Sequence, residues 1–119
     1  MRNFRDLDVW KDSIALVKEI YILIDKLPSS EKFGLKSQIS RCAVSIPANI
    51  AEGSAKDSQK DFIRYLQISL GSAFELETHI IICKELSFIL PKDEKEIMEK
   101  LNILQKRINA LIKYSKSQI

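Results

Sequence analysis

The sequence predicts an all-α protein, an antiparallel up-down-up-down four-helix bundle that forms one domain over residues 1–119. The 119 residues include only three glycines and three prolines, which is too little turn-forming material for an all-β fold. Apolar residues recur every three or four positions along four long segments, as in amphipathic helices. The connections between these segments are short, so neighbouring helices should run antiparallel.

The first predicted helix covers about residues 6–27. Its main apolar stripe consists of residues three or four positions apart: Leu7, Trp10, Ile14, Val17, Tyr21 and Ile24. A second stripe beside it consists of Leu16, Ile20, Leu23 and Leu27. The apolar face is therefore wider than one helix contact needs. Pro28 should stop this helix, and Ser29 or Ser30 can cap the next one.

The second predicted helix covers about residues 31–52. Its stripe consists of Leu35, Ile39, Cys42, Ile46 and Ile50. Pro47 lies inside it, lacks an N–H group and crowds the carbonyl of Ala43, so we expect a kink or a local opening there. Gly53 is expected to cap the C-terminal end of this helix.

The third and fourth predicted helices cover about residues 58–88 and 91–115. One face of the third carries Phe62, Leu66, Ser69, Ala73, Leu76, Ile80 and Cys83, and a second face carries Ile63, Leu70, Phe74 and Ile81. Small residues at 71–73 lower helix propensity, by about 1 kcal/mol for the glycine, and indicate the close approach of another helix. The stripe of the fourth helix is regular: Ile97, Leu101, Leu104, Ile108 and Leu111.

Residue patterns of common catalytic sites are missing from the sequence, so we expect no enzyme, no catalytic residue, no metal site and no cofactor. His79 is the only histidine, four positions after Glu75. A di-iron carboxylate bundle needs two Glu-x-x-His motifs and two further glutamates, and a nucleophilic triad needs a group to orient the histidine. The glycines are isolated, so no phosphate-binding loop is predicted.

The two cysteines and the hydropathy pattern favour a cytoplasmic protein. Cys42 and Cys83 have no partner at metal or redox spacing and are interpreted as reduced core thiols. The longest apolar candidate, residues 80–83, is far too short to span a membrane. The charged N-terminal segment does not resemble a secretion signal.

Polar residues recur beside the apolar stripe of the second helix and in the third helix. They are Arg41, Ser45, Asn49, Glu52 and Glu75. Buried polar groups need hydrogen-bond or ionic partners, and Glu75 can pair with Arg41. We interpret this set as a structural or interfacial polar cluster that sets helix register, in preference to a ligand site.

Basic residues form two groups on a chain whose net charge is only +3. The candidate nucleic-acid contacts are Lys56, Lys60, Arg64, Lys100, Lys106, Arg107 and Lys113. From Lys100 to the last residue the chain has no acidic side chain. In one monomer a solvated helix face is the simpler interpretation, but repetition of the basic groups in an oligomer would add phosphate contacts.

Residues 41–53, Arg-Cys-Ala-Val-Ser-Ile-Pro-Ala-Asn-Ile-Ala-Glu-Gly, resemble the signature of the four-helix bundle proteins encoded within 23S rRNA intervening sequences. Residues 4–10 resemble the opening of that family, and Phe62, Tyr65, Leu66 and residues 71–78 resemble its third helix. The resemblance implies a ring-like homopentamer. It also implies kinship in fold with the accessory variability determinant of diversity-generating retroelements, which binds nucleic acid and a reverse transcriptase.

Together these features predict a non-enzymatic homo-oligomer, expected to be a pentamer, that binds RNA or a nucleoprotein through phosphate contacts. The resemblance also implies that Arg41, Asn49, Glu52 and Glu75 occupy recurrent polar positions of the family, with structural or interfacial roles. The alternative is a protein–protein interaction scaffold without a nucleic-acid role, in which the basic residues only aid solubility.

Overall fold

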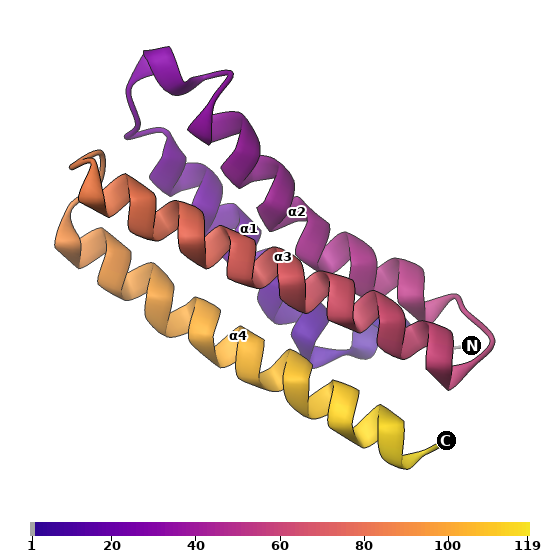
Figure 1. Ribbon diagram of the computed structural model, residues 1–119. Helices are drawn as coiled ribbons and strands as arrows, with labels where there is room; N and C mark the ends of the chain where they lie inside the picture. Colours follow the sequence, from indigo (N-terminus) through magenta and orange to yellow (C-terminus); the bar gives the residue numbers. More distant parts are fainter. Residues whose placement is uncertain (1) are drawn as a thin grey trace.

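A computed structural model describes residues 2–119 and confirms the four-helix bundle. The helices are α1 (Asp8–Ile24), α2 (Leu35–Ser54), α3 (Gln59–Glu85) and α4 (Pro91–Ser117). Two short 3₁₀ turns precede α1 and α2, at Phe4–Asp6 (η1) and Ser29–Glu31 (η2). Successive helices run in alternate directions (Figure 1). The molecule measures 46 × 24 × 19 Å, so its long axis is about the length of one 27-residue helix.

The helices enclose a single core. Each packs against its neighbours in the sequence, and α4 closes the ring by packing against α1. Among residues 2–119, the diagonal pairs α1–α3 and α2–α4 make no close backbone contact. The largest fully buried side chains are aliphatic and come from all four helices: Ile20, Ile39, Ile46, Ile50, Leu66, Leu76, Ile80, Leu101, Leu104 and Ile108. The predicted stripes of α2, α3 and α4 therefore form most of the core.

The order of the two stripes on α1 is the reverse of the prediction. The second stripe, represented by Leu16, Ile20 and Leu23, is buried in the core. In the stripe that was predicted to be the main one, Ile14 is 44% exposed and Tyr21 is also exposed. The width of an apolar face does not fix how the helix is rotated about its axis relative to the core. The packing of the neighbouring helices determines which part of the face is buried.

The start of α2 and the role of Gly53 also differ from the predictions. The chain forms η2 and a turn after Pro28, so neither Ser29 nor Ser30 caps α2. Glu31 reaches forward, and its Oε1 accepts a hydrogen bond of 3.3 Å from the backbone N–H of Leu35. Gly53 is not a C-cap but a buried helical residue, since α2 continues to Ser54.

Pro47 is buried inside α2, and the helix runs through it without the predicted opening. Two carbonyls next to the proline gain side-chain donors. The Oγ of Ser69 on α3 donates to the Ile46 carbonyl at 2.9 Å, and the Nδ2 of Asn49 donates to the Ser45 carbonyl at 2.8 Å. The carbonyl that loses its ladder donor to the proline is that of Ala43, so these two bonds add to the helical ladder on either side and do not replace the missing one.

The close approach predicted for residues 71–73 occurs at Ser72, whose hydroxyl lies 2.9 Å from that of Ser45 on α2, and not at Gly71. A Cβ atom added to Gly71 would meet nothing within 4 Å, whereas one added to Gly53 would lie 2.6 Å from the Cβ of Tyr65. The close contact between α2 and α3 is therefore centred on Gly53, with the Ser69–Ile46 hydrogen bond nearby along the same pair of helices.

Helix α3 ends three residues before the predicted position because Ser87 adopts a left-handed conformation with φ of 61°. The N–H of Phe88 donates to the Cys83 carbonyl, and the N–H of Ser87 donates to the Lys84 carbonyl, both at 2.9 Å. This is the Schellman arrangement, which usually has glycine at the left-handed position.

Ser87→Gly should raise the free energy of unfolding by about 1 kcal/mol, because glycine removes the steric penalty of the left-handed backbone. Urea denaturation measures the change. Ser37→Gly, inside α2, is the control and should lower stability by about 0.5–1 kcal/mol. Destabilisation of similar size by both substitutions would contradict this account of the α3 terminus.

Candidate nucleic-acid interface

Four exposed cations lie on the adjacent helices α3 and α4. Lys60 and Arg64 are in the first turns of α3, and Lys106 and Lys113 are in the second half of α4. Because the two helices are antiparallel, the start of α3 lies beside the end of α4 (Figure 1). None of the four takes part in an ion pair within the part of the chain that the structure describes. Lys60, Arg64 and Lys113 lie toward this end, and Lys106 lies level with the middle of α3, since the neighbouring Gln105 donates to Glu77. We call these four residues the basic surface.

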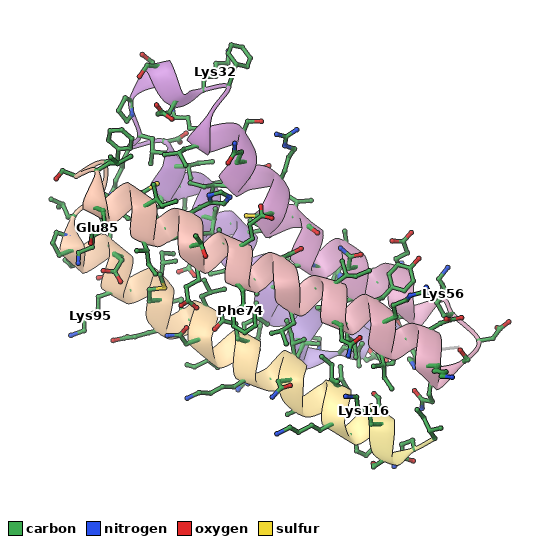
Figure 2. All side chains as sticks on the ribbon, viewed as in Figure 1. Lys32, Lys56, Phe74, Glu85, Lys95 and Lys116 are labelled. Carbon is green, nitrogen blue, oxygen red and sulfur yellow. The ribbon has the colours of Figure 1, made fainter. Side chains whose placement is uncertain are left out.

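The neighbourhood of the basic surface contains charges of both signs. Figure 2 shows Lys56 and Lys116 at this end of the bundle. Asp57 and Asp61 are also exposed there and weaken the positive field. Lys116 adds a further exposed cation on the last turn of α4.

Lys56 contacts Tyr65 through its side chain and Arg2 through its backbone. Its side chain is half-buried, and its ammonium lies 5.1 Å from the centroid of the Tyr65 ring. Its carbonyl accepts a 3.1 Å hydrogen bond from Nη1 of Arg2. Arg2 also lies 4.1 Å above the Phe62 ring and donates to Gln59 at 2.7 Å. Sequence reasoning missed Arg2 as a cation of this end, since only the tertiary structure brings it to α3.

Two other predicted contacts, Lys100 and Arg107, point toward α1 and are not part of the basic surface. Lys100 forms an ion pair with Glu19, and Arg107 forms one with Asp12. These pairs cross a groove of about 670 Å³ between α1 and α4. Their charge is partly neutralised, so they contribute less to an anion-binding field than the unpaired cations.

The predicted polar cluster separates into a bonded part and an exposed part. The hydroxyls of Ser45 and Ser72 are 2.9 Å apart and connect α2 to α3, and Nδ2 of Asn49 donates to the Ser45 hydroxyl at 2.9 Å. Ser45 and Asn49 are half-buried, as expected for groups that set helix register. The exposed members are Arg41, Glu52 and Glu75.

The predicted Arg41–Glu75 pair is not among the ion pairs of residues 2–119. Arg41 lines a surface hollow with Tyr21 of α1. Glu75 instead approaches the histidine on its own helix, with 3.3 Å between Oε2 of Glu75 and Nε2 of His79.

Cys42 lies beside this Glu75–His79 pair. The ligand atoms of Cys42, Glu75 and His79 all lie within 4.8 Å of one another. Burial raises the pKa of the Cys42 thiol to about 12, and the negative charge of Glu75 adds to the rise. The thiol therefore stays protonated near neutral pH in the protein as folded, and its Sγ donates to the Ile39 carbonyl at 3.4 Å.

Sequence reasoning noted the spacing of Glu75 and His79 but treated Cys42 as an isolated thiol. The register of α2 against α3 joins the three residues. Ser45 faces Ser72, and in an antiparallel pair three residues back along α2 are level with three residues forward along α3. These steps lead to Cys42 and Glu75. The proximity of Cys42 to Glu75 could therefore be inferred only after one contact between α2 and α3 was known.

The observed arrangement defines a class of small antiparallel helical bundle with a polar α2–α3 seam and exposed cations along α3 and α4. Within residues 2–119, no helix is long and apolar enough to cross a membrane. The chain belongs to the family described as "23S rRNA-intervening sequence protein", which matches residues 5–110. The resemblance drawn from the motif at residues 41–53 is thereby confirmed.

A solved structure supports the same assignment. The chain is similar to a crystal structure of a protein of unknown function from the S23 ribosomal protein family of Bacteroides thetaiotaomicron. The two share 29% sequence identity with a TM-score of 0.81, and the match covers 88% of this chain and 95% of the other. No curated protein matches the chain.

Proposed function

We propose that the protein is a non-enzymatic, cytoplasmic homo-oligomer that binds RNA through the phosphates of its backbone. The observation that carries this proposal is the basic surface, with Lys60 and Arg64 on α3 and Lys106 and Lys113 on α4. All four are exposed, and none is neutralised by an ion pair within residues 2–119. Flexible lysines on helix surfaces suit phosphate oxygens and carry little information about base sequence.

Oligomerisation would strengthen such binding because each copy adds its own basic surface. Exposed apolar side chains support this step: Ile22 on α1 is 62% exposed and Ile103 on α4 is 53% exposed, and both line the groove between these helices. Large apolar side chains left in water favour association with another surface. The resemblance to the family leads us to expect a pentamer, in which one surface of each copy meets a different surface of the next.

Reversing the charge of two members of the basic surface should weaken RNA binding. Lys106→Glu combined with Lys113→Glu removes two phosphate contacts from a single strand. The slope of log affinity against log salt concentration is negative, and its magnitude should decrease by at least about 1.4. Fluorescence anisotropy with a labelled single-stranded RNA at several salt concentrations measures both the affinity and the slope.

The matched control is Lys92→Glu combined with Lys95→Glu, which makes the same change of net charge on the same helix. Both residues are exposed in the first turns of α4, at the opposite end from Lys113. The control should keep most of the affinity. Equal losses in the two variants would mean that net charge alone drives binding, and unchanged binding in the first would rule out this surface.

The alternative function, a protein–protein interaction scaffold, is favoured by exposed apolar residues on α3. Phe74 projects from the middle of this helix (Figure 2), and Ile81 is exposed two turns further along. Native mass with and without nuclease, with the ratio of nucleic-acid to protein absorbance across the peak, separates the two functions. RNA that nuclease removes from the oligomer supports the proposal, and a protein partner retained after nuclease treatment supports the scaffold.

A further inference from the structure

Three chemically different metal ligands meet where α2 packs against α3. The Sγ of Cys42 comes from α2, and a carboxylate oxygen of Glu75 and a ring nitrogen of His79 come from α3. All three atoms lie within 4.8 Å of one another. A thiol, an imidazole and a carboxylate are the three groups that bind Zn²⁺ in proteins.

The spacing of the three atoms is close to that of a tetrahedral site. With metal–ligand distances of about 2.0–2.3 Å, tetrahedral ligand atoms are about 3.4–3.6 Å apart. The Oε2 of Glu75 and Nε2 of His79 are already 3.3 Å apart. The sulfur needs at most about 1 Å of closure toward the other two atoms. The Glu75 side chain, 57% exposed, can move toward the sulfur, and a rotation of the Cys42 or His79 side chain would close the remaining sulfur–nitrogen distance.

The second nitrogen of His79 needs a partner other than the metal. Its Nδ1 atom is buried and has no hydrogen-bond partner within residues 2–119. Buried polar atoms of native proteins nearly always have a partner, either in the protein or in bound water or ions. The side chain is only 14% exposed. A metal held at Nε2, the atom beside Glu75, leaves Nδ1 protonated, so this nitrogen then needs an acceptor such as a bound water molecule.

We propose that Cys42, Glu75 and His79 bind one Zn²⁺ ion per chain and thereby cross-link α2 to α3. The sulfur and nitrogen ligands select a borderline-soft divalent metal, since Mg²⁺ and Ca²⁺ prefer sites made of oxygen. The dication also replaces the repulsion between a thiolate and the Glu75 carboxylate by attraction to a shared centre. A water molecule completes the tetrahedron on the exposed side, next to Glu75.

The site is separate from the RNA-binding proposal. Lys106 and Lys113 lie on α4, and Lys60 and Arg64 share α3 with two of the ligands but precede Glu75 by about three turns. The metal should therefore bind to protein that carries no nucleic acid, and the two proposals can fail independently.

Titration of the untagged, metal-free full chain with Co²⁺ tests the site directly. Tetrahedral Co²⁺ with one thiolate ligand gives intense visible d–d bands and a near-ultraviolet band from sulfur-to-metal charge transfer. We expect both, saturating at one ion per chain and disappearing when Zn²⁺ is added in competition. The melting temperature of the protein should also rise with Zn²⁺ concentration, because the metal binds only the folded arrangement.

The variants distinguish this site from adventitious binding. Cys42→Ala should abolish the charge-transfer band, whereas Cys83→Ala removes the other buried thiol and should leave it unchanged. His79→Gln should weaken Zn²⁺ affinity by at least about 100-fold, since even groups that only orient metal ligands contribute about 10–100-fold. Glu75→Gln should also weaken Zn²⁺ affinity. Its matched control is Glu85→Gln on the same helix, which should leave the affinity unchanged.

Several results would overturn the proposal. One is the absence of a charge-transfer band at saturating Co²⁺ in the wild-type chain. Another is a band that survives in Cys42→Ala or is lost equally in Cys83→Ala. If Cys42→Ala does not fold, His79→Gln decides the matter, because unchanged Zn²⁺ affinity in this folded variant is incompatible with the site.

Discussion

Ile20→Ala should destabilise the bundle by about 2–5 kcal/mol, whereas Ile14→Ala should cost less than about 1 kcal/mol. Ile20 is 0% exposed in the core, and its truncation leaves a cavity that four packed helices cannot readily fill. Ile14 is 44% exposed on the same helix, so most of its side chain is already in water. The two substitutions remove the same atoms and differ only in location.

Urea denaturation at several protein concentrations measures both changes. The concentration series matters because a residue at a contact between copies would affect stability through association. A loss at Ile14 that shrinks on dilution would place this residue in an oligomer contact, because dilute protein no longer gains stability from association. Equal, concentration-independent losses at Ile14 and Ile20 would contradict the observed rotation of α1.

Gly53→Ala should lower the free energy of unfolding by about 1–3 kcal/mol, even though alanine is the better helix former by about 1 kcal/mol. The new Cβ would lie 2.6 Å from the Cβ of Tyr65 and 3.4 Å from Cδ1 of Phe62. Cβ atoms cannot rotate away from each other, so α2 and α3 must separate. Gly71→Ala should instead stabilise the protein by up to about 1 kcal/mol, because the added atom meets nothing within 4 Å.

A second substitution identifies the cause of the Gly53 effect. Tyr65→Ala retains the Cβ atom that makes the contact, so it should not rescue Gly53→Ala. Chemical denaturation of the double variant measures this. Full rescue would show that the tyrosine ring, rather than the approach of the two backbones, is the constraint. Stabilisation by Gly53→Ala alone would contradict the close packing of α2 on α3.

The core of α2, α3 and α4 could be predicted because α2 and α4 have one apolar stripe each, and the face of α3 with more residues in register is the buried one. Ile46, Leu76 and Leu101 all lie in stripes that the sequence spacing predicts, and all are buried. Helix α1 has two stripes of similar strength, so spacing alone could not rank them. The end of α3 was predicted three residues too late for a different reason. Ser87 adopts the left-handed conformation that ends the helix, and this position is usually occupied by glycine.

The candidate sites were predictable only in part. Exposed lysines such as Lys106 and Lys113 follow from their position opposite the apolar stripe of α4. The pairing of Lys100 and Arg107 with acidic residues of α1 could not be read from the sequence, because the partners are more than 80 positions away. The proximity of Cys42 to Glu75 could not be read from the sequence either, because it depends on the register of α2 against α3.

Four amphipathic helices follow from the amino-acid sequence without any knowledge of contacts, and the motif at residues 41–53 identifies the family. Apolar periodicity and the scarcity of turn residues are local properties, so they can be read without knowing any contact. The packed bundle was needed to show the rotation of α1, the tight helix contact at Gly53 and the grouping of Cys42, Glu75 and His79. These features depend on how the helices turn and slide against one another, which the packing of the whole core sets and no single segment encodes.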